Sequence, residues 1–163
     1  MQRYLLSIAA TLLLILIVLV GSVPLLDWYE QQRHQAQIAE SRTRWQEHVV
    51  DRYAFTIRKR CSCPPPGNLP LRFTVVDARV TSVVQAETGE ALSTDGLDEI
   101  PHSIPAVFDE LVDIVVRRPD ELVVAFDERF GFPSVIEADF DEDFNHDDVS
   151  YEIVDFRVIR NEP

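Results

Sequence analysis

Two cysteines, Cys61 and Cys63, are the residues of this chain whose type and spacing most clearly permit chemistry. They lie in residues 53–66, where apolar side chains alternate with Thr, Arg and Ser, a pattern typical of a half-buried strand that the prolines at 64–66 end. Thiols outside the cytoplasm tend to be joined. Residues two apart on a strand lie about 6.6 Å apart, at the outer limit for a disulfide. The pair is interpreted either as a structural clasp, which is favoured, or as a strained and reducible redox pair.

The surroundings of the two thiols bear on these alternatives. Arg58, Lys59 and Arg60 precede them, and positive charge lowers the pKa of a thiol. No Cys-x-x-Cys motif is present, which argues against a redox enzyme. A copper or zinc site would need further ligands, and the histidines are scattered, at His34, His48, His102 and His146. A thiol-redox or metal-binding protein is therefore the alternative function that this pair suggests.

The acidic segment 139–148 is the second candidate for chemistry. Oxygen-bearing side chains stand two residues apart in it, as in a calcium loop, at Asp139, Asp141, Asp143, Asn145 and Asp147. The sixth position of such a loop is Gly and the twelfth is Glu, but this chain has Phe144 and Ser150 there. We interpret the segment as a solvated acidic turn, with calcium-dependent stabilisation at millimolar concentration as the alternative. No other cofactor is expected.

The sequence shows no catalytic set. It lacks a glycine-rich phosphate loop, a His-Glu-x-x-His motif and a serine between elbow glycines. The carboxylates of Asp109, Glu110 and Asp113 are expected on the solvent side of a helix. No catalytic residue is therefore predicted, and a non-catalytic role is favoured.

Length and charge limit the class of protein and its partners. The 163 residues allow one compact domain and a short appendage. The formal net charge is −13, which repels phosphate backbones, so no nucleic-acid partner is expected.

The N-terminal segment predicts a membrane anchor. Residues 4–26 carry no charged side chain and are long enough to cross a bilayer as a helix. Arg3 precedes them and Asp27 follows, which puts the N-terminus in the cytoplasm and the remainder outside. A cleaved signal peptide is the alternative, but the apolar run is long for one and no small-x-small cleavage site follows. We predict an anchor over residues 1–26, a helical stalk over 27–43 and an exported domain over 44–163.

The exported part predicts an α+β fold with a sheet of about six strands. The stalk helix carries an apolar stripe of Ile38, Trp45 and Val49, whose end is expected to dock on the sheet. A second helix begins after Ser103 as N-cap, with Ile104, Val107, Phe108, Leu111, Val112 and Val115 as its apolar face. Strands are expected at 53–63, 71–75, 79–87, 122–126, 135–140 and 149–159, with 122–126, apolar throughout, as a central strand. The order helix, three strands, helix, three strands indicates a possible α-β-β-β duplication on one antiparallel sheet.

Several residues together resemble a known family. Trp45, the pair Tyr53-x-Phe55 and the run Cys61-x-Cys63-Pro64 resemble a family of small exported bacterial domains of unknown function. The resemblance extends over about residues 44–159 and implies an exported domain, but no activity and no catalytic residue. The sequence thus favours a membrane-anchored, extracytoplasmic, non-catalytic module that binds a protein partner in the envelope.

Overall fold

The computed structural model describes residues 29–48, 51–60, 65–93, 97, 100–140 and 148–160. Ile38–Pro163 form one compact unit, while the helical residues 29–37 belong to another. Among the described residues, no helix is both long and apolar enough to cross a membrane. The predicted anchor over 4–26 lies outside them, so it stays a prediction.

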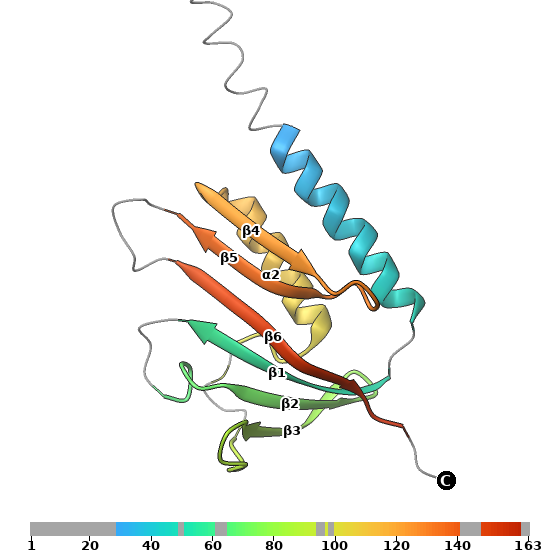
Figure 1. The fold of residues 1–163 in the computed structure, drawn as a ribbon, viewed down its shortest axis with the longest axis vertical. Helices are drawn as coiled ribbons and strands as arrows, with labels where there is room; N and C mark the ends of the chain where they lie inside the picture. Colours follow the sequence, from blue (N-terminus) through green and yellow to red (C-terminus); the bar gives the residue numbers. More distant parts are fainter. Residues whose placement is uncertain are drawn as a thin grey trace, which may run out of the picture. The chain divides into compact units, whose positions relative to one another are not determined.

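The compact unit is an antiparallel sheet with helices, as the α+β prediction requires. Six strands follow the order β3-β2-β1-β6-β5-β4 across the sheet, and every neighbouring pair is antiparallel (Figure 1). Their bounds are β1 Arg52–Arg60, β2 Leu71–Val76, β3 Arg79–Gln85, β4 Glu121–Phe126, β5 Pro133–Asp139 and β6 Val149–Val158. The described residues hold two helices, one over 29–47 and α2 over Ile104–Arg117.

The order of elements repeats along the chain, as expected. A helix precedes the meander β1-β2-β3, and α2 precedes the meander β4-β5-β6. The two meanders lie in the same direction across the sheet, so the first strand of one pairs with the last strand of the other. A duplication of the sequence itself stays a prediction.

The expectation of a central strand at 122–126 is wrong. β4 is an edge strand, bonded on one side to β5 only, and its exposed and half-buried residues alternate. Val123 is 46% exposed, whereas Leu122, Val124 and Phe126 pack against the core. The prediction failed because Val123 and Ala125 are apolar, as core residues are, but lie on the face of the sheet opposite Leu122, Val124 and Phe126.

β1 is the strand that lies deepest in the sheet. Its alternation was expected to leave Thr56 on the solvent side, yet Thr56 is only 2% exposed. Arg72 of β2 and Val154 of β6 are its cross-strand partners, and these larger side chains flank the small threonine. In the middle of a six-stranded sheet, a short side chain can therefore be buried between larger side chains of the neighbouring strands.

The far end of β1 is polar on the same face. Arg58 forms an ion pair with Glu152 over 3.2 Å, and Arg60 pairs with Glu137. Both arginines are more than half exposed, so each pair adds little to stability.

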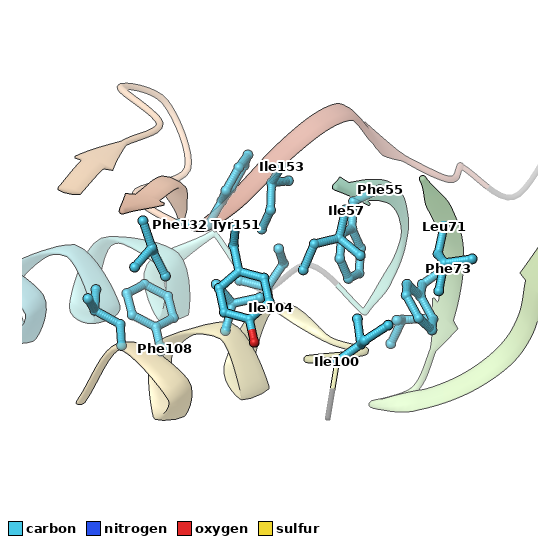
Figure 2. Packing of buried hydrophobic residues seen from close by; sticks show 14 of the residues in the cluster. Phe55, Ile57, Leu71, Phe73, Ile100, Ile104, Phe108, Phe132, Tyr151 and Ile153 are labelled. Atoms are coloured by element: carbon cyan, nitrogen blue, oxygen red, sulfur yellow. The ribbon is translucent and has the colours of Figure 1, made fainter. Parts of the chain in front are cut away.

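The core lies between the sheet and α2. Figure 2 shows side chains of β1, β2 and β6 gathered in one layer with Ile104 and Phe108 of α2. The buried residues of α2 are Ile104, Val107, Phe108, Leu111, Ile114 and Val115. Ile114 thus takes the core position that the sequence assigned to Val112, which is 39% exposed.

Helix residues from Ile38 onward complete this core. Ile38, Ser41 and Trp45 are buried, spaced by three and four residues as one face of a helix requires. Arg42 reaches α2, where it bonds to Asp109 over 2.8 Å and lies over the ring of Phe108. The predicted docking of this helix through Trp45 is confirmed, whereas Val49 lies outside the described residues.

Candidate functional site: an arginine-lined cleft

Most of the residues singled out in the sequence lie outside the described part of the structure. This holds for Cys61 and Cys63, and for Asp141, Asp143, Asn145 and Asp147. Asp139 is described, half-buried as the last residue of β5. Arg60, the last residue of β1, pairs with Ser150 at the start of β6. The described strand ends that precede the cysteines and follow the acidic segment are therefore neighbours in the sheet.

No group of three or more metal-ligating side chains occurs within the described ranges. Asp109 and Asp113 are exposed on α2 and Glu110 is half-buried, in agreement with their expected position on a solvated helix face.

A cleft of about 610 Å³ lies at the end of the sheet where β1 begins and β6 ends. Three parts of the chain line it: the region before and at the start of β1, the loop after β4, and the end of β6 with the two residues after it. The lining residues are His48, Asp51, Arg52, Arg129, Phe130, Phe156, Arg157, Val158, Ile159 and Arg160. The backbone N–H of Ile159 donates to the carbonyl of Arg52 over 2.9 Å, which ties two of these segments together. The volume lies in the range of small-molecule sites, about 300–1,000 Å³.

Arginines dominate the polar lining of this cleft. Within the part of the chain that the structure describes, its lining includes one carboxylate, that of Asp51, and four arginines: Arg52, Arg129, Arg157 and Arg160. The guanidinium group is always charged and presents several N–H donors in a planar fork, which suits carboxylate and phosphate groups. The cleft is thus a positively charged region in a chain of net charge −13.

Aromatic side chains form the apolar part of the lining. The rings of Phe130 and Phe156 lie 5.0 Å apart, and the imidazole of His48 lies 5.2 Å from the ring of Phe130. Nδ1 of His48 is 2.7 Å from the carbonyl oxygen of Arg44. Because a carbonyl only accepts, Nδ1 carries the proton in this hydrogen bond, which leaves Nε2 for another partner.

A bulge in β6 brings Phe156 to this position. Thr56 of β1 pairs with Val154, but Ala54 pairs with Arg157, so β6 has one extra residue at this point. Asp155 takes the left-handed conformation there, with φ of 53°. The extra residue reverses the alternation of β6, so that Phe156 faces the core side with Trp45, at 5.8 Å between ring centres.

The loop after β4 holds Arg129 and Phe130 at the cleft. Oδ1 of Asp127 accepts the backbone N–H groups of Arg129 and Phe130, over 3.0 and 2.7 Å. The guanidinium of Arg129 then lies over the ring of Phe130, 4.9 Å from its centre. The loop therefore presents one positive and one aromatic side chain on a fixed backbone.

Sequence reasoning missed this cleft because its residues come from three distant segments. One local signal was present: the apolar alternation of β6 changes phase between Ile153 and Phe156, which indicates a bulge. A second signal was the presence of two basic residues, Arg157 and Arg160, close together in an otherwise acidic C-terminal half of the chain.

The fold and the cleft define a small α+β domain with a ligand-sized, positively charged hollow at one end of its sheet. The chain belongs to a family of unknown function, DUF6174, whose family model matches residues 37–158. The match supports the expectation of a domain of unknown function and leaves the pattern of Trp, Tyr, Phe and Cys residues untested. No curated protein and no solved structure matches the chain.

Proposed function

We propose that this protein is a membrane-anchored, extracytoplasmic binding domain that holds its ligand in the arginine-lined cleft without catalysing a reaction. The observation that carries the proposal is the cleft itself: a hollow of ligand size with charged donors and aromatic rings at its surface. The predicted anchor at 4–26, with the N-terminus in the cytoplasm, supports the location. A protein of the envelope or a small molecule would be its ligand.

Photo-crosslinking tests the binding role. A photoreactive amino acid in place of Val158, which lines the cleft and is 43% exposed, is compared with the same residue in place of Val123, on β4 and 46% exposed. The two variants of the full chain are irradiated in cells, and the mass of each adduct is measured. A defined adduct at position 158 that is absent at 123 is expected. Identical adducts at both positions, or none at 158, would contradict the proposal.

Protease treatment of intact cells or spheroplasts tests the location. The full chain should remain with the membrane after an alkaline wash, and its folded domain should be accessible from outside. Removal of residues 1–26 should leave the domain on the cytoplasmic side because nothing then directs its export. Protection of the full chain from external protease would overturn the location.

The thiol alternative rests on Cys61 and Cys63. One described feature bears on it: Arg58 and Arg60 form ion pairs with carboxylates. Because these carboxylates partly neutralise the two arginines, the arginines are less able to lower the pKa of a nearby thiol. This favours a structural clasp over a redox or metal role. Alkylation of the full chain with and without reductant, with the metal content measured, distinguishes these uses.

Calcium-dependent stabilisation through 139–148 is the second alternative. It predicts that millimolar calcium raises the melting temperature of the full chain, and that Asp143→Asn with Asp147→Asn abolishes the rise. An unchanged melting temperature would exclude it.

A further inference from the structure

The distribution of charge between the cleft and the rest of the chain restricts what the cleft can bind. Among the described residues, four arginines and one carboxylate, that of Asp51, line the cleft. The charge of this lining attracts anions, whereas the net charge of −13 of the whole chain repels them.

Three of these arginines are available to an incoming anion. Within the described residues, Arg129, Arg157 and Arg160 form no ion pair with a carboxylate, unlike Arg58 and Arg60 on the same sheet. All three are exposed, while Arg52 is half-buried. Several guanidinium groups around one hollow match a dianion better than a single carboxylate, and a phosphate monoester offers two charges and three acceptor oxygens.

The rings add a second requirement. Phe130, Phe156 and Val158 line the same hollow as the arginines, so a ligand that fills it meets apolar surface as well as charge. The cleft has a volume of about 610 Å³, whereas a water molecule takes about 30 Å³ in the liquid. One inorganic phosphate, which is a small ion, would therefore leave most of the cleft unfilled. An apolar or aromatic body attached to the phosphate would occupy the remainder.

The net charge of the chain limits the size of the ligand. The Debye length at physiological ionic strength is about 8 Å, so a compact anion inside the cleft responds mainly to the arginines. An extended polyanion, or an anionic membrane surface, would also extend over the rest of a chain whose net charge is −13. Electrostatics therefore favour a small soluble ligand over a polymer or a bilayer.

We propose that the cleft binds a small phosphate monoester with an apolar or aromatic body. This inference rests on the proposed binding function and specifies its ligand class. The guanidinium groups of Arg129, Arg157 and Arg160 bind the phosphate, and Phe130 contacts the apolar body.

Phenyl phosphate serves as the probe for the full chain, measured by calorimetry or by chemical shift changes. It should bind about tenfold or more tightly than inorganic phosphate, which lacks the ring, and than benzoate, which lacks the second charge. Long-chain polyphosphate and vesicles containing phosphatidic acid should bind more weakly than phenyl phosphate. Equal binding of phenyl phosphate and inorganic phosphate, or tighter binding of polyphosphate or of vesicles, would overturn the inference.

Matched variants assign the binding to the cleft. Arg157→Gln combined with Arg160→Gln should weaken phenyl phosphate binding about tenfold or more. Arg118→Gln is the control: Arg118 is exposed and precedes β4, whose opposite end leads into the loop that carries Arg129, so the change should leave binding unchanged. Phe130→Ser should reduce the preference for phenyl phosphate over inorganic phosphate. An equal effect of Arg118→Gln would show that only net charge matters.

The two proposals can fail separately. If phenyl phosphate does not bind but a photoreactive residue at position 158 still captures a defined ligand, the ligand class is wrong and the binding function stands. If neither experiment gives a signal, both proposals are wrong.

Discussion

The phenolic oxygen of Tyr53 accepts a hydrogen bond from the backbone N–H of Ile104 over 3.1 Å. Tyr53 lies on β1, in the middle of the sheet, and Ile104 is the first residue of α2. Both are buried. A side chain of the sheet therefore satisfies a backbone donor of the helix, and this single bond fixes where α2 begins relative to β1.

The other donors at this end of α2 are also accounted for. The first N–H groups of a helix have no acceptor within it. Pro105 has none to satisfy, Ala106 donates to Oγ of Ser103 over 3.3 Å, and Val107 donates to the carbonyl of Ser103 over 3.0 Å. With Ile104 bonded to Tyr53, no N–H of the first turn lacks an acceptor, which is what burial of this helix end requires.

Tyr53→Phe should therefore destabilise the domain although it removes one oxygen atom only. The N–H of Ile104 would be left buried without an acceptor, at a cost of about 1–3 kcal/mol. Urea unfolding of the full chain measures the loss. Tyr29→Phe is the control, because Tyr29 is 65% exposed and should change stability by less than about 0.5 kcal/mol. Equal stability of both variants would show that the bond is not important.

The same residue predicts a dependence on alkaline pH. Burial raises the pKa of the Tyr53 hydroxyl above its ordinary value of 10.0, and the N–H of Ile104 opposes this in part. Because the folded form holds this proton more tightly than the unfolded form, its contribution is fully present below pH 10 and is lost as the pH rises through the raised pKa. The stability difference between the wild type and Tyr53→Phe should be constant up to about pH 9 and should shrink as the pH rises through and above 10. A difference that stays constant above pH 10 would contradict the assignment.

The elements could be predicted from sequence where a period and its end signals agreed. α2 begins after Ser103 and ends at Arg117 because a capping serine, Pro105 and an apolar face with helical spacing all indicated the same segment. Strand positions followed from alternation in the same way. The lateral order of the strands did not, since a run such as Leu122–Phe126 is compatible with both a central and an edge strand.

The cleft could not be predicted because it depends on pairing between distant segments. Arg52 and Arg157 are 105 positions apart in the chain and line one hollow only because β1 pairs with β6. Local patterns instead drew attention to Cys61, Cys63 and the acidic segment, where reactive or charged types are adjacent in sequence. Residues that are neighbours in the sequence can be found by reading it, whereas residues that come together in space can be found only when the order and pairing of the strands are known.

Gly131 should be among the least tolerant positions of the loop that carries Arg129 and Phe130. Its φ is +80°, and a Cβ there would lie 2.7 Å from the backbone oxygen of Ser41. Gly131→Ala therefore combines the cost of a left-handed alanine, about 1–2 kcal/mol, with a clash against helix backbone.

Gly89 provides the matched control. Its φ is +74°, but a Cβ there would meet nothing within 4 Å. Gly89→Ala should cost about 1 kcal/mol and Gly131→Ala distinctly more. Thermal unfolding of the two variants gives the comparison, and equal costs would mean that the contact with Ser41 adapts without penalty.

Asp155 should accept glycine. It is the residue of β6 at positive φ, so Asp155→Gly relieves a left-handed conformation and should leave stability unchanged or raise it by up to about 1 kcal/mol. Urea unfolding of the full chain measures the change. A clear loss of stability would show that the side chain of Asp155, and not only its backbone conformation, holds the bulge in β6.

Trp45 should connect the stability of the helix to the shape of the cleft. Its indole makes edge contacts with Tyr53, Phe132 and Phe156, at 5.4, 6.2 and 5.8 Å between ring centres. Trp45→Ala should cost about 3–5 kcal/mol, because a large buried ring is removed from a packed cluster. Trp45→Phe retains an aromatic ring and should cost clearly less. Since Phe156 also lines the cleft, Trp45→Ala should weaken ligand binding under conditions where the variant is still folded. A loss of stability without any change in ligand binding would show that the bulge in β6 alone holds the shape of the cleft.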